Sequence, residues 1–178
     1  DDLIIPSEVS SSYPYDTKQR FQTEAPILDV IVTLGFLAAG TSTLRLATGV
    51  YILPLRDVYA TARALQTLDI LSKGRVIFGV GVGWLAEEFD IVGRAFSDRA
   101  AIADEAIEVL NALWQDAEPS FDGDHFSFPP VRFEPKPVQQ PRPPIVFGGE
   151  SRAALRRAAY SGDGWYGHRP KVHEVRDT

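Results

Sequence analysis

The segment RVIFGVGVGW, at residues 75–84, is the most informative stretch of this chain. It follows a turn at residues 72–74 and is rich in β-branched and aromatic residues, which is typical of a β-strand. Gly79, Gly81 and Gly83 occupy alternate positions, so one face of the strand is predicted to be bare backbone. Interior glycines weaken a strand by about 0.5–1 kcal/mol each. The pattern therefore indicates that either a flat ligand ring or a tightly packed neighbouring element lies against this face.

Composition narrows the class of protein. The chain has 178 residues, enough for one domain with a core, and its 44% hydrophobic and 24% charged residues are ordinary for a soluble globular protein. The net charge of −6 argues against nucleic acid or an anionic membrane as a partner. The absence of cysteine excludes disulfides, thiolate metal sites and thiol nucleophiles. No apolar run reaches the roughly 18 residues of a membrane span and no signal peptide is recognisable, so we expect a cytoplasmic protein.

The three histidines do not indicate a metal site. His125, His168 and His173 lack the spacing of metal ligands, and we expect them in loops or on the surface. Glu87 and Glu88 are adjacent on a predicted helix, so they should face different directions and not form a catalytic carboxylate pair.

Strands and helices alternate along the chain. The predicted strands cover residues 2–5, 44–53, 75–83, 145–148 and 164–168. The predicted helices cover residues 26–39, 57–73, 85–92, 97–115 and 151–160, with caps at Asp57, Ser97 and Ser151. This alternation favours βαβ units and a parallel sheet. Residues 118–144 are rich in proline and aromatic residues and predict a hairpin and a stiff connector, within a single domain of residues 1–178.

Five parallel strands are too few to close a barrel. A (β/α)8 barrel needs eight units in about 250 residues, so we expect an incomplete barrel here. The first predicted strand begins at the first residues, and the chain contains no methionine, not even an initiator. We therefore expect the open edge of the sheet to be buried by a second copy or by residues outside this chain.

A second chemical feature is the segment Gly148-Gly149-Glu150-Ser151, which joins a predicted strand to a predicted helix. Backbone N–H groups at the start of a helix attract anions, and glycines let a phosphate approach the main chain. Arg152 and Arg156 could add positive charge, whereas Glu150 would repel a phosphate. The alternative is a simple turn with a helix cap. A dinucleotide fingerprint in the earlier glycine strand is excluded, because its third glycine would fall at Trp84.

The third feature is Thr48-Gly49, inside an otherwise strong predicted strand. A glycine at such a position indicates a bulge or the close approach of a ligand to the backbone. A kink at the rim of a barrel explains it equally well.

Seven segments together resemble one protein family. They are LRLATGV (44–50), TLDILSKGR (67–75), GVGVGW (79–84), EEF (87–89), FEPKPVQ (133–139), GGES (148–151) and GDGW (162–165). In this order they resemble the luciferase-like monooxygenase superfamily, close to its branch of oxidoreductases that depend on the deazaflavin coenzyme F420. The resemblance runs from residue 1 to about residue 167. It implies a (β/α)8 barrel, usually dimeric, with a flavin or deazaflavin at the carboxyl ends of the strands.

The resemblance also implies roles for individual residues. Thr48, Gly49 and Val50 match a strand segment whose bulge, often with a non-proline cis peptide, supports the tricyclic ring. The remaining matches are Gly81, Val82 and Gly83 for the ring and ribityl chain, Gly148, Gly149, Glu150 and Ser151 for the cofactor phosphate, and Trp165 as an aromatic position nearby. The sequence departs from the family at Asp2, where many deazaflavin members carry His, and the family's first and last strands are absent.

The implied activity is a hydride transfer between coenzyme F420 and a small organic substrate. FMN is the alternative cofactor, and would make the protein a monooxygenase. Two further alternatives are a non-catalytic flavin-binding protein and a phosphate-handling barrel enzyme of another kind. The resemblance identifies no catalytic acid or base, and it implies a homodimer without nucleic acid or membrane partners.

Overall fold

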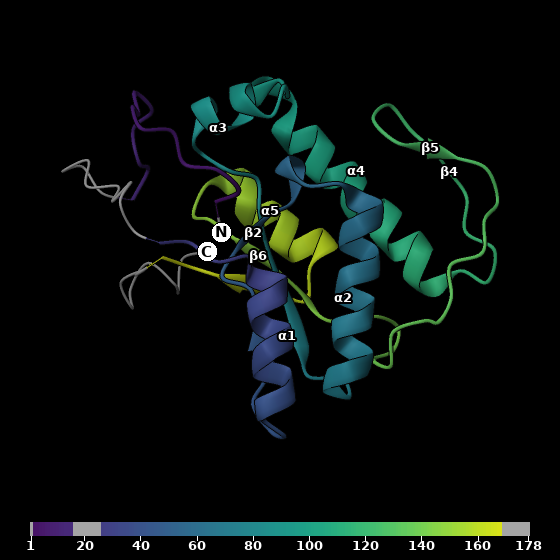
Figure 1. Cartoon of the computed structure of the whole chain (residues 1–178). Helices are drawn as coiled ribbons and strands as arrows, with labels where there is room; N and C mark the ends of the chain where they lie inside the picture. Colours follow the sequence, from purple (N-terminus) through teal and green to yellow (C-terminus); the bar gives the residue numbers. More distant parts are fainter. Residues whose placement is uncertain (1, 16–25, 169–178) are drawn as a thin grey trace.

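The computed structural model describes residues 2–15 and 26–168 and shows a parallel sheet flanked by helices (Figure 1). The strands of the sheet are β1 (Leu46–Ala47), β2 (Tyr51–Ile52), β3 (Val76–Gly81), β6 (Ile145–Gly148) and β7 (Gly164–Tyr166). Their order is β1-β3-β6-β7, with β2 also paired to β3, and every pairing is parallel. The predicted fold class, an incomplete parallel barrel of about five strands, is therefore confirmed.

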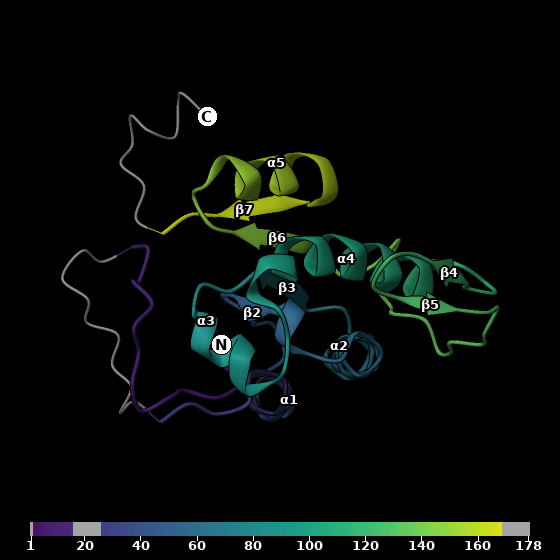
Figure 2. The same cartoon turned by 90° about the horizontal axis from the view of Figure 1, so that it is seen from above.

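The helices surround this sheet. They are α1 (Val30–Gly40), α2 (Val58–Ser72), α3 (Ala86–Ile91), α4 (Arg99–Gln115) and α5 (Arg152–Ser161), with the 3-10 turns η1 (Leu53–Leu55) and η2 (Phe96–Asp98). Helix α2 contacts both α1 and α4, whereas α5 contacts β6 and β7. Seen from above, α5 and α1 lie at opposite ends of the row of strands (Figure 2). The short hairpin of β4 (Phe121–Asp122) and β5 (Ser127–Phe128) projects away from the sheet.

Two predicted helix starts are confirmed and two are corrected. The side chains of Asp57 and Ser151 cap α2 and α5, accepting from backbone N–H groups at 2.7 and 3.2 Å. Helix α1 begins four residues later than Pro26, because the carboxylate of Asp29 accepts the N–H of Val32 at 2.9 Å and caps it there. Ser97 caps nothing, since it lies within η2 and α4 begins only at Arg99.

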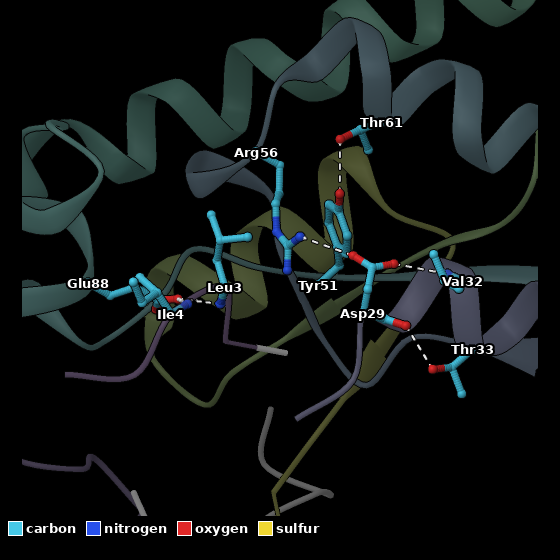
Figure 3. A network of polar contacts seen from close by, with 9 residues as sticks. All are labelled: Leu3, Ile4, Asp29, Val32, Thr33, Tyr51, Arg56, Thr61 and Glu88. Carbon is cyan, nitrogen blue, oxygen red and sulfur yellow. Dashed lines mark hydrogen bonds and ion pairs between the residues drawn. The ribbon is translucent and has the colours of Figure 1, made fainter. Parts of the chain in front are cut away.

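The predicted strand at residues 2–5 is wrong. The described part of this segment is irregular, and the N–H groups of Leu3 and Ile4 donate to a side chain, the carboxylate of Glu88 (Figure 3). Apolar β-branched residues favour a strand only where another strand is present to pair with their backbone. Here a carboxylate oxygen binds the backbone N–H groups instead. The sheet still has five strands, because the predicted strand 44–53 is divided into β1 and β2.

The break between β1 and β2 is a β-bulge. Ala47 pairs with Ile77 and Tyr51 pairs with Val80, so four steps along one strand face three steps along β3. One extra residue is thereby inserted within Thr48–Val50, where sequence patterns allowed a bulge. A bulge bends its strand and turns local side chains in new directions.

The core lies between α2, α4 and the sheet. Ala62 and Leu65 of α2, Leu110 of α4 and Phe78 of β3 are all fully buried. Trp114 is also buried, and its indole N–H donates to the carbonyl of Ala62 at 3.2 Å. Within residues 2–15 and 26–168, no helix combines the length and apolar character that crossing a membrane requires.

Buried polar groups hold the connector and the helix ends to this core. The carboxylate of Asp69, fully buried in α2, accepts the backbone N–H groups of Val138 and Gln139 at 2.9 and 3.0 Å. The guanidinium of Arg75 donates to the carbonyls of Ala38 and Leu44 at 2.9 and 2.8 Å. Buried polar groups are stable only when they are paired. These contacts therefore give a structural role to two of the family segments, TLDILSKGR (67–75), which contains Asp69 and Arg75, and FEPKPVQ (133–139), which binds Asp69.

Candidate functional site

The carboxyl ends of β2, β3, β6 and β7 meet around a cavity of about 590 Å³. This is the end at which parallel barrel enzymes place their active sites. Nine of the eleven residues predicted to bind a cofactor line this cavity: Gly49, Val50, Gly81, Val82, Gly83, Gly148, Gly149, Glu150 and Ser151. Thr48 and Trp165 do not line it, and each lies behind a lining segment.

Thr48 holds the bulge against the glycine strand. Its hydroxyl accepts the N–H of Gly79 at 2.8 Å and donates to the carbonyl of the same residue at 2.7 Å. The two backbones are so close that a Cβ added at Gly79 would lie 1.9 Å from the carbonyl oxygen of Thr48. The peptide bond between Gly49 and Val50 is cis. The bulge is therefore pinned from below by a buried threonine, and its next two residues face the cavity.

Val50 fills the space beside the other glycines. A Cβ at Gly81 would lie 2.6 Å from one methyl group of Val50, and a Cβ at Gly148 would lie 2.7 Å from the other. The bare glycine face is thus covered by a neighbouring element, which was one of the two explanations left open by the sequence. The consequence for the site is that Val50, rather than the glycine backbone alone, forms this part of the cavity floor.

The loop after β6 is held in one conformation. Gly149 has φ of +112°, a value that side chains rarely tolerate. Its carbonyl accepts the indole N–H of Trp165 at 2.6 Å, and Ser151 caps α5. Trp165 therefore supports the loop from outside the cavity, and we revise its expected role to positioning.

Among the described residues, Arg99 is the arginine that lines the cavity, and sequence reasoning missed it. It lies at the first position of α4, where its guanidinium donates to the carbonyls of Gly83 and Phe96 at 3.3 and 2.7 Å. Burial and the neighbouring Arg157 lower the pKa of Arg99. Arg152 and Arg156, which the sequence suggested for this role, are not among the residues that line the cavity.

Aromatic side chains form another part of the lining. Tyr13 packs edge-on against Trp84, with ring centroids 5.0 Å apart, and Tyr15 lies 4.9 Å from His168. All four residues line the cavity; His168 lies in the loop after β7, as expected, and the side of this loop that it occupies faces the cavity. Burial, followed by the carboxylate of Glu150, raises the pKa of Tyr15. Trp84 belongs to the GVGVGW segment, but no local pattern marks Tyr13, Tyr15 or His168 as its neighbours, because the four residues come from three distant segments.

The two adjacent glutamates of α3 face different directions, as predicted. Glu87 accepts hydrogen bonds from Ser10 and Ser11, whereas Glu88 is buried and accepts from Leu3 and Ile4. Burial raises the pKa of Glu88, partly opposed by those two backbone N–H groups. Figure 3 shows the neighbouring Arg56, which pairs with Asp29 at 3.4 Å and lies over the ring of Tyr51.

The parallel sheet, the cavity at its carboxyl edge and the glycine segments around it agree with a match over nearly the whole sequence. A family model described as luciferase-like monooxygenase matches residues 10–177. The chain belongs to this family.

Three proteins that are similar to this chain illustrate the family. The uncharacterized protein Rv0953c of Mycobacterium tuberculosis is 36% identical over 160 residues, which is 90% of this chain and 55% of that protein. An FMNH(2)-dependent dimethylsulfone monooxygenase of Pseudomonas putida is 34% identical over 133 residues, 73% of this chain and 36% of the enzyme. The solved structure of an F420-dependent secondary alcohol dehydrogenase has the same fold, with a TM-score of 0.72 at 24% identity, over 81% of this chain and 44% of that one. The chain thus spans little more than half the length of the curated relatives that it matches.

Proposed function

We propose that the cavity binds a tricyclic flavin-type cofactor and that the whole protein is an oxidoreductase acting on a small organic molecule. The observation that carries this proposal is the convergence of nine predicted residues, from three separate segments, on one cavity. Its volume of about 590 Å³ falls within the range typical of small-molecule sites. When bound, such a cofactor would supply the two-electron chemistry, and the protein would bind, orient and shield it.

The residues that line the cavity fit both the ring and the phosphate of a flavin-type cofactor. At one end, Val50 and the adjacent glycines offer a surface with few protruding side chains, supported from below by Thr48. At the other end, Gly149 and Ser151 open α5, whose first N–H groups carry partial positive charge, and Arg99 contributes a full positive charge to the same cavity. An apolar floor joined to an anion-attracting end suits a flat ring carrying a phosphate.

Coenzyme F420 is the cofactor that we favour, because the glycine strand and the connector at residues 133–139 resemble the F420-dependent branch most closely. FMN is the second candidate, and the 34% identical dimethylsulfone monooxygenase supports it. The two cofactors share the ring, the ribityl chain and the phosphate that these residues would hold. Titrating the purified protein with each cofactor and following its absorbance would distinguish them.

The phosphate assignment is tested by Gly149→Val, with Gly93→Val as the matched control. Both glycines have positive φ values, +112° and +70°, but only Gly149 lines the cavity. Gly149→Val should weaken cofactor binding more than tenfold, or about 1.4 kcal/mol, because a branched side chain blocks the approach to the backbone. Gly93→Val should lower stability only. A folded Gly149→Val protein with unchanged affinity would contradict the phosphate site, and a wild-type protein that binds neither cofactor would contradict the function.

We also propose that two copies of the protein associate, as the family resemblance implies. Helix α1 supports this proposal, because Val32 and Phe36 expose 72% and 81% of their surface there. Sedimentation analysis of the wild-type protein and of Phe36→Asp tests it. A dimer that Phe36→Asp dissociates is expected, whereas a monomeric wild-type protein would contradict the proposal.

A further inference from the structure

The N-terminal segment, residues 10–15, runs from α3 to the cavity, and Glu87 anchors its first two residues. One carboxylate oxygen of Glu87 accepts the backbone N–H groups of Ser10 and Ser11 at 2.6 and 2.8 Å and the Ser10 hydroxyl at 2.6 Å. The other oxygen accepts the Ser11 hydroxyl at 2.6 Å. Hydrogen bonds to a charged acceptor are the strongest of their kind. Those from Ser10 and Ser11 hold the pKa of Glu87 well below its usual range, so the carboxylate stays charged.

Ser11 forms a second connection to α3. Its hydroxyl oxygen also accepts the N–H of Ala86, the first residue of the helix, at 3.2 Å. Ser11 thus caps α3 from a distant part of the chain, since the residue at the cap position, Leu85, has no side-chain acceptor. The start of the segment is therefore bound to α3 in two ways: Ser10 and Ser11 donate to the Glu87 side chain, and Ser11 accepts from the Ala86 backbone.

The other end of the segment forms an aromatic wall of the cavity. Tyr13 lies against Trp84, immediately after the glycine strand, and Tyr15 lies against His168. The hydroxyl of Tyr15 lies 3.4 Å from the position that a Cβ would take at Gly149. The wall therefore spans the cavity from the end of β3 to the loop after β6.

The residues that Glu87 anchors are close in sequence to the tyrosines of the wall. Only Ser12 lies between Ser11 and Tyr13, and an extended chain covers at most about 3.6 Å per residue. Releasing Ser11 therefore removes a fixed point next to Tyr13 in the chain, although Glu87 itself does not line the cavity. Exposed aromatic faces that meet at a cavity are suited to a flat conjugated ring, which stacks on them or meets their edges.

We propose that Tyr13 and Tyr15 form a ligand-binding wall for a flat conjugated ring and that Glu87 is the positioning residue that holds this wall in place. The inference rests on the proposed function, because it requires a ring-shaped cofactor or substrate in the cavity. It assigns to Glu87, the first glutamate of the EEF segment (87–89), a role that the phosphate site proposed at Gly149 and Ser151 does not explain.

The test is a mutant cycle, with FMN and F420 as the probes. Glu87→Ala should weaken binding of the probe by about fivefold to tenfold, because the wall loses its position. Glu87→Gln should lie close to the wild type, since its amide oxygen keeps three of the four hydrogen bonds. In a Tyr13→Ala/Tyr15→Ala background, Glu87→Ala should change affinity by less than about twofold. Glu108→Ala, at an exposed glutamate of α4, is the matched control.

A second measurement keeps the anchor testable by itself. Hydrogen exchange at the amides of Ser10 and Ser11 should accelerate in Glu87→Ala and not in Glu108→Ala. The inference is overturned if Glu87→Ala binds like the wild type, if its effect persists without the two tyrosines, or if exchange is unchanged. A folded wild-type protein that binds neither probe contradicts the proposed function and with it the wall, while the exchange result still decides whether Glu87 anchors the segment.

Discussion

Replacing Gly79 with alanine tests whether the contact between the bulge and the glycine strand governs stability. The added Cβ would lie 1.9 Å from the carbonyl oxygen of Thr48 and 3.0 Å from its carbonyl carbon. Both atoms belong to backbone, so a rotamer change cannot relieve the clash. The bulge must move away, and the two hydrogen bonds between the Thr48 hydroxyl and Gly79 then stretch or break.

The expected cost follows from these two effects. Overpacking of a core typically costs about 1–3 kcal/mol, and each lost hydrogen bond about 0.5–1.5 kcal/mol. Gly79→Ala should therefore lower the free energy of unfolding by roughly 2–6 kcal/mol. That is a large part of the 5–15 kcal/mol or so that stabilises a typical domain.

Urea denaturation monitored by circular dichroism measures this change, with Gly35→Ala as the control. Gly35 lies within α1, and a Cβ there would meet nothing within 4 Å. Gly35→Ala should raise the free energy of unfolding by about 0.5–1 kcal/mol, because alanine restricts the unfolded chain and favours a helix. A Gly79→Ala protein within about 0.5 kcal/mol of the wild type would refute the close backbone contact.

Three further predictions concern polar groups. Glu88→Gln should preserve both backbone hydrogen bonds, because they share one carboxylate oxygen, and should leave stability unchanged or higher at pH 7. Burial raises the pKa of Glu88, so any gain in stability should vanish below about pH 4.5, where the glutamate is protonated in both the folded and the unfolded protein. Asp163→Asn should lower stability by about 1 kcal/mol at neutral pH. Although burial alone would raise the Asp163 pKa, hydrogen bonds from Arg142 and a backbone N–H lower it, so this difference should shrink as pH falls below 3.8. Trp165→Phe should weaken cofactor binding about fivefold with little change in melting temperature, because it removes the donor to Gly149; equal affinities would contradict the positioning role.

Local patterns were sufficient to predict most elements. The alternation of apolar runs with capped helices indicated α2, α3, α5, β3, β6 and β7, because propensity, caps and turn glycines act over a few residues. The strand predicted at residues 2–5 was wrong for the complementary reason, because Leu3 and Ile4 bind Glu88, which is distant in sequence. The early start predicted for α1 was a local error, because the cap is Asp29, only three residues before Val32.

By itself, the sequence determined the parallel sheet, the glycine face of β3, the loop at Gly149 and the family, since each is written in contiguous residues. Only the tertiary structure decided what covers that face and what else lines the cavity. Val50 covers the glycines because a one-residue bulge shifts the register between two strands, which composition does not reveal. Arg99 and Tyr13 reach the cavity through packing between segments distant in the chain. Such long-range contacts depend on the whole fold, and no short stretch of residues encodes them.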